Sequence, residues 1–172
     1  MNIYITSGTF NFMKIKKDKH PAEKILLMQN AETTVLLHET TSKTIFASPR
    51  KYEVVGGTGE LPENGYVVMN NIPVSEEGRP VFEHRFKNIS GFIEKEPGLV
   101  ALRILRPIHS ETYVILTIWE KQTNFLSWKN SSSFEQAFHN NGSNSPVTNS
   151  SQKMFSGEAY LTQYTLVKDS DE

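Results

Sequence analysis

The chain has 172 residues, and its 18 Lys and Arg against 19 Asp and Glu give a formal net charge of -1. This length allows one domain with a good hydrophobic core or two small domains. The balanced charge lacks the surplus of basic residues on which non-specific nucleic-acid binding depends. The sequence contains no cysteine, which excludes disulfides, thiolate metal sites and thiol nucleophiles. No apolar run reaches the ~18 residues of a membrane span and no signal-peptide pattern is present, so we expect a cytoplasmic protein with no nucleic-acid and no membrane partner.

Residues 1–62 are rich in short apolar runs that predict strands. A helix is expected around residues 14–20, and residues 49–59 fit either a short helix or an edge strand. The runs that predict strands are NIYITSGT, KILLMQN, TTVLLHE and TIFASP.

Residues 65–74 predict a strand whose alternation places one amide, Asn70, on an otherwise apolar face. A buried amide without partners costs roughly 1 to 3 kcal/mol, so this position requires an explanation. Pro80 then opens a helix, and its apolar stripe follows a period of about 3.6 residues. The stripe consists of Phe82, Phe86, Ile89 and Ile93.

The rest of the chain predicts two strands, a helix and a last strand. Residues 99–107 and 112–120 read as strands around a turn, and the second of them is apolar on both faces, as in a central strand. A second helix is expected over residues 122–140, with a break near residues 130–133 and a restart where Ser132 and Glu135 form a capping-box pattern. Residues 140–153 are polar and turn-rich and predict a mobile loop, and residues 158–167 predict a strand.

This order of strands and helices, βαββαβ, is the ferredoxin-like arrangement of an α+β protein. Residues 1–62 look like a reduced version of the same unit, so we expect a strand-rich N-terminal half at 1–62 and a ferredoxin-like domain at 63–172. The two sheets are expected to pack together as a barrel within one chain.

Several segments resemble the antibiotic-biosynthesis-monooxygenase superfamily and, within it, the Isd-type haem-degrading monooxygenases. The segments are MNNIPVSEEGRPVFEHRFKN, EPGLVALRILRP, TYVILTIWE and FLSWKNSSSFEQAF, and YITSGT, ILLMQ, LHET and YEV extend the resemblance to the N-terminal part. The resemblance implies a dimeric-α/β-barrel type of fold, made pseudo-dimeric by the N-terminal half. A monomer is therefore expected, with a dimer as the alternative.

The resemblance also implies a site. In this family an Asn on the first strand, a Trp on the second helix and a His ten residues after the Trp act together, and Asn70 and Trp128 match the first two positions. The third position is Phe138, and His139 follows it, about 100° further round a helix. The implied chemistry uses haem as substrate and cofactor, with dioxygen and an external electron donor, and it opens the porphyrin ring and releases iron. Asn70 would direct the oxidation, Trp128 would distort the macrocycle, and His139 would ligate the iron.

Other interpretations stay open. Taken singly, Asn70 fits a structural amide near Pro73, Trp128 fits a core residue, and His139 fits a solvated residue at a helix end. A register shift at the helix break would return His139 to the iron, or another group would hold the haem. If catalysis is lost, the chain is a non-enzymatic signalling or haem-binding protein of the TRAP kind. A monooxygenase of the same superfamily without haem is a third possibility.

Overall fold

The computed structural model describes residues 1–134 and 154–168. Phe138, His139 and the predicted loop at 140–153 lie outside these residues. The elements are β1 (Asn2–Gly8), α1 (Phe10–Asp18), β2 (Lys24–Gln29), β3 (Thr34–Thr40), β4 (Arg50–Thr58), β5 (Tyr66–Pro73), α2 (Arg79–Ile93), β6 (Leu99–Ile108), β7 (Thr112–Trp119), α3 (Gln122–Lys129), α4 (Ser132–Phe134) and β8 (Tyr160–Leu166).

The strands form a closed antiparallel barrel in the order β1-β3-β2-β8-β5-β7-β6-β4. This order divides into β4-β1-β3-β2 for the N-terminal half and β8-β5-β7-β6 for the C-terminal half. The two halves have the same strand order, because β1 lies between β4 and β3 just as β5 lies between β8 and β7. Alternate side chains fill the barrel, for example Ile3, Leu37, Val67, Met69 and Leu116, as the two-residue period of a strand requires. The predicted α+β, ferredoxin-like barrel with a strand-rich N-terminal half is confirmed.

Two seams join the halves, and they differ in length. The β4–β6 ladder runs from Lys51↔Ile108 to Thr58↔Leu102, whereas β2 and β8 pair only at Met28↔Leu166 and Gln29↔Thr165. Residues 50–58 are therefore an internal strand, between β1 and β6, and the prediction of a short helix or an edge strand is wrong.

The predicted strand at TIFASP is also wrong, because residues 44–49 are irregular. Its neighbouring residues Ile45 and Phe46 both pack into the same cluster, with Met13 and Leu36. Successive side chains of a strand point to opposite faces, so a regular strand does not allow this packing.

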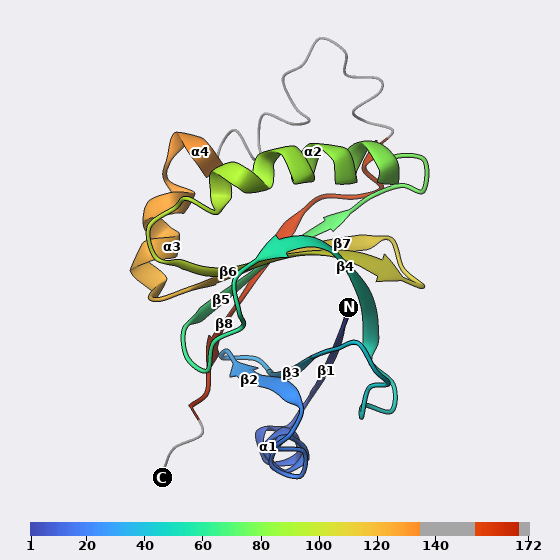
Figure 1. Ribbon diagram of the computed structural model, residues 1–172, viewed down its shortest axis with the longest axis vertical. Helices are drawn as coiled ribbons and strands as arrows, with labels where there is room; N and C mark the ends of the chain where they lie inside the picture. The colour runs from blue at the N-terminus through green and yellow to red at the C-terminus, as the bar shows by residue number, and fades with distance from the viewer. Residues whose placement is uncertain (135–153, 169–172) are drawn as a thin grey trace.

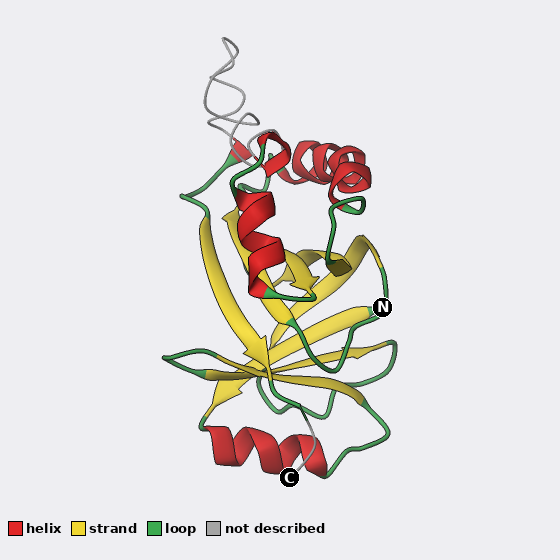
Figure 2. Cartoon of the chain, turned by 90° about the vertical axis from the view of Figure 1, so that its left-hand side faces the viewer, coloured by secondary structure: helices red, strands yellow, loops and turns green. Residues whose placement is uncertain are grey.

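The helices cover the outside of the barrel. Figures 1 and 2 show α1 beside the N-terminal half, with the barrel between it and α2, α3 and α4. The predicted α2 is confirmed, with Pro80 in its first turn and Phe82, Phe86 and Ile93 buried. α1 begins earlier than predicted because Thr9 caps it, accepting a hydrogen bond from the Phe12 backbone N–H at 3.4 Å. No helix within residues 1–134 and 154–168 is long and apolar enough to span a membrane.

Candidate functional site

Two adjacent asparagines on β5 have opposite environments, because successive side chains of a strand point to opposite faces. Asn71 is buried, and its amide nitrogen lies 3.2, 3.2 and 3.1 Å from Met69 O, Tyr160 O and Thr162 Oγ1. Asn70 is only 7% exposed, and its side chain has no hydrogen-bond partner within the described part of the chain, although its amide atoms are not among the fully buried atoms that lack a partner. Asn71 is thus a structural amide, whereas no hydrogen bond to the described residues holds the Asn70 amide.

Asn70 faces a small cavity between the sheet and the helices that follow β7. The cavity has a volume of about 10 Å³, close to the lower limit for one water molecule. Trp128 lies at the same cavity, so the structure brings these two predicted residues together. The lining consists of Val68, Asn70, Ile115, Thr117, Phe125, Trp128, Phe134 and Leu161.

Aromatic side chains close the cavity. The Trp128 ring lies 5.2 Å from Trp119 and 4.9 Å, edge to face, from Phe134. Trp119 is fully buried, and its indole N–H donates a hydrogen bond of 2.9 Å to Thr117 Oγ1. Such ring pairs add to the stability that burial alone provides. Trp128 is therefore held in place by a second tryptophan, which the Thr117 hydroxyl orients.

The predicted helix break after Trp128 is confirmed, but its cap is not the predicted one. α3 ends at Lys129 and α4 begins at Ser132, so the capping residue is Ser131 and not Ser132. The Ser131 hydroxyl donates to Trp128 O and accepts from the Phe134 backbone N–H at 3.4 Å. This turn sets Phe134 beside Trp128 at the cavity.

The described histidines all lie away from this cavity. His38 is buried in the N-terminal half, where its ring nitrogens lie 2.8 Å from Glu23 Oε1 and 2.9 Å from Thr44 Oγ1. His84 lies 3.3 Å from the Asn88 amide on α2, while His20 and His109 do not line the cavity. Residues 1–134 and 154–168 contain no cluster of three His, Asp or Glu side chains able to hold a metal ion.

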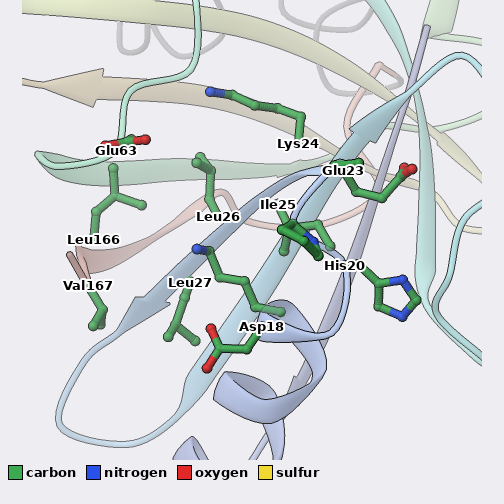
Figure 3. A pocket seen from close by; sticks show the side chains of 13 residues that line it. Asp18, His20, Glu23, Lys24, Ile25, Leu26, Leu27, Glu63, Leu166 and Val167 are labelled. Atoms are coloured by element: carbon green, nitrogen blue, oxygen red, sulfur yellow. The ribbon is translucent and has the colours of Figure 1, made fainter. Parts of the chain in front are cut away.

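A larger pocket of about 430 Å³ lies at the short β2–β8 seam (Figure 3). Its size suits a small ligand, but the charges of its lining are mixed. Three basic and three acidic side chains line it: Lys17, His20, Lys24, Asp18, Glu23 and Glu63. We therefore place the candidate site at Asn70 and not at this pocket.

Sequence reasoning missed most of the lining, although part of it could have been found. β5 and β7 pair antiparallel with Asn70↔Ile115, Val68↔Thr117 and Tyr66↔Trp119. Once this register is known, the alternation of TYVILTIWE places Thr117 and Trp119 on the face of Asn70. Tyr66 closes the end of this face, 6.3 Å from the Phe125 ring, and burial raises its pKa.

Comparison with known proteins finds a family model that matches part of the chain, and relatives of low identity that cover most of it. Residues 65–140 match the family model described as antibiotic biosynthesis monooxygenase. A heme-degrading monooxygenase from Listeria monocytogenes is 24% identical over 129 residues, 75% of this chain and 77% of that protein. The signal transduction protein TRAP from Staphylococcus epidermidis is 25% identical over 138 residues, 80% of this chain and 83% of that protein.

The fold has solved counterparts. A structure described as a major regulator of staphylococcal pathogenesis has a TM-score of 0.82 at 24% identity, covering 96% of this chain and 98% of that chain. At this identity the likeness shows the fold alone. Residues 65–140 of the chain thus resemble the antibiotic biosynthesis monooxygenase family, and a heme-degrading enzyme and TRAP are both among the proteins to which the chain is similar.

Proposed function

We propose that this chain is a haem-degrading monooxygenase whose site is the cavity between β5 and α3. The observation that carries the proposal is the Asn70 amide, which is buried, has no partner within the described residues and faces a cavity beside Trp128. A buried amide of this kind lowers stability, and such costs are typical of functional sites. The heme-degrading relative from Listeria monocytogenes supports haem as the substrate.

The lining suits haem in chemistry but not in volume. Apolar and aromatic side chains surround a single amide, as a large apolar ring with one reactive centre would require. The cavity of about 10 Å³ is far below the roughly 300–1,000 Å³ of ligand pockets. Haem binding therefore requires Trp128 and Phe134 to move away from the sheet.

Each residue has a proposed task. Bound haem would supply the activation of dioxygen and would itself be the molecule that is oxidised. Asn70 would supply a hydrogen-bond donor for the bound oxygen, and Trp128, once moved from its contact with Trp119, would pack against the haem and distort it. His139 is the proposed iron ligand, with Phe138 at the family's usual ligand position. Electrons would come from an external donor.

The small volume of the cavity supports a second candidate function. A TRAP-like signalling protein needs no open pocket, whereas a non-enzymatic haem-binding protein would need the same opening as the enzyme. The TRAP relative is as similar as the heme-degrading relative, at 25% against 24% identity. A monooxygenase without haem would likewise keep the apolar cavity and dispense with the iron ligand. Because the barrel closes within one chain, we propose a monomer for all three, with a dimer as the alternative.

Haemin titration tests the proposal, and the chain offers a convenient probe. Its only two tryptophans, Trp119 and Trp128, belong to the cluster at the cavity, so intrinsic fluorescence reports on this site. We expect saturable quenching together with a shifted Soret band. Added ascorbate in air should then bleach the band and release ferrous iron to a chelator.

Variants assign the roles. His139→Ala should remove the shifted Soret band, while the matched control His84→Ala on α2 should keep it. Asn70→Ala should bind haemin and bleach slowly. Absence of a shifted band at excess protein would exclude haem as ligand, and binding without bleaching would favour the non-enzymatic alternative.

A further inference from the structure

The outer face of α1 carries apolar side chains that the fold does not use. Met13 is the buried residue of this helix, whereas α2 buries Phe82, Phe86 and Ile93. Phe12 is 61% and Ile15 55% exposed. Because residues three apart are neighbours on a helix surface, Phe12 and Ile15 form an exposed apolar pair on this face.

The same face is basic. Residues 12, 15, 16 and 19 lie on one side of a helix, so Lys16 and Lys19 flank Phe12 and Ile15. The Lys16 ammonium lies 5.6 Å from the centre of the Phe12 ring. Between Phe10 and His20 there are four lysines and one aspartate, a net charge of +3, in a chain whose total is -1. The rest of the chain thus carries -4, and the positive charge is concentrated on α1.

We infer that α1 docks the protein on an anionic lipid surface. Phe12 and Ile15 would enter the boundary between headgroups and acyl chains, and Lys16 and Lys19 would meet lipid phosphates. Short helices with aromatic and basic residues bind this boundary without crossing the bilayer. A hollow of about 490 Å³, lined by Phe12, Met13 and Phe46 among others, continues the apolar surface beside the helix.

Lipid explains this face better than a protein partner does. A protein groove that holds a helix takes an unbroken apolar stripe at i, i+3, i+4 and i+7, and here Lys16 and Lys19 occupy the last two of these positions. A bilayer surface accommodates apolar and basic side chains next to each other. The aliphatic part of a lysine lies along apolar groups while its ammonium group reaches the lipid phosphates. Asp18 pairs with Lys14 at 2.9 Å, and it is already counted in the net charge of +3.

The geometry leaves the candidate site free. Figures 1 and 2 place the barrel between α1 and α2–α4. A surface-bound molecule would hold α3 away from the bilayer. Docking is therefore independent of the proposed haem chemistry.

Sedimentation with lipid vesicles tests the inference on the full chain. We expect binding to vesicles containing phosphatidylglycerol and none to pure phosphatidylcholine, with loss of binding between about 0.01 and 1 M salt, where the Debye length shrinks from ~30 to ~3 Å. Lys16→Gln with Lys19→Gln should weaken binding about 25-fold, from ~1 kcal/mol for each lysine. Phe12→Ser with Ile15→Ser should weaken it at least about tenfold.

Phe92→Ser is the matched control, because Phe92 is 68% exposed on α2, across the barrel. This variant should bind vesicles like the wild type. Absence of binding to anionic vesicles, or binding that the α1 variants leave unchanged, would overturn the inference. Binding to polyglutamate but not to vesicles, lost in the lysine variant and kept in the Phe12 and Ile15 variant, would overturn it in favour of an acidic protein partner.

Discussion

Replacing Asn70 with leucine should stabilise the protein, which is unusual for a polar-to-apolar change at a functional position. Leucine has the same number of side-chain heavy atoms as asparagine in the same branching pattern, and the adjoining cavity of about 10 Å³ gives its methyl groups some room. A buried polar group without a partner costs about 1–3 kcal/mol. Because Asn70 keeps 7% of its surface exposed, we take the lower part of that range, a gain of about 1–2 kcal/mol.

Asn71 is the matched control on the same strand. Its amide lies within hydrogen-bond distance of three acceptors, at 3.1 to 3.2 Å, so Asn71→Leu leaves buried acceptors unpaired. We expect that variant to lose about 1–3 kcal/mol. Two neighbouring Asn→Leu changes are thus expected to have opposite signs.

Urea unfolding followed by tryptophan fluorescence measures both effects, since Trp119 and Trp128 are buried. In a thermal melt of a domain of this size, a stabilisation of about 1–2 kcal/mol corresponds to a rise in Tm of roughly 2–8 °C. The Asn70→Leu variant should also lose haemin bleaching, as a stability–activity trade-off predicts. A loss of more than about 1 kcal/mol in Asn70→Leu would mean that the amide has a partner in the folded protein, and the argument for an unpaired functional group would fail.

Three other changes test the surroundings of the site. Thr117→Val removes the acceptor of the buried Trp119 N–H and should cost about 1–3 kcal/mol, measured by urea unfolding. Phe134→Ala should cost about 3 kcal/mol by opening the cavity and should speed haemin association in stopped-flow fluorescence. Arg106 lowers the pKa of Glu83 below its ordinary 4.5, so this carboxylate stabilises the fold above that pH, and the contribution is lost as the pH falls through the folded-state pKa. Glu83→Gln should therefore cost roughly 1 kcal/mol at neutral pH, since Arg106 is 36% exposed, and should flatten the acid limb of a urea-midpoint titration.

The C-terminal half was predictable because its patterns are local. The alternation around Asn70, the stripe on α2 and the break after Trp128 can each be read within a short window. The other walls of the cavity depend on which strands pair and in what register. That information is absent from any one segment, so Thr117, Leu161 and Trp119 escaped prediction.

The N-terminal half was harder because its structure depends on distant partners. β4 pairs with β1 and with β6, and its ladder with β6 shifts register between Val54 and Gly56. At Gly57, with φ of 144°, a Cβ atom would lie 2.1 Å from Leu102 O on β6. The close approach of β6, which lies far along the chain, therefore requires a glycine at this position. Long-range pairing of this kind overrides local propensity.

The two halves of the barrel also show why one of them carries the candidate site. Among the polar side chains buried on the outer faces of the two sheets are His38 in the first half and Asn70 in the second. In the first half the segment after β3 folds back, and Thr44 and Glu23 satisfy both nitrogens of His38 while Phe46 packs 5.6 Å from its ring. In the second half Trp128 and Phe134 bring no hydrogen bond to Asn70, and a cavity remains beside it. A fully paired polar group stabilises its half, whereas an unpaired one lowers stability unless a ligand pairs with it, so the asymmetry itself points to Asn70.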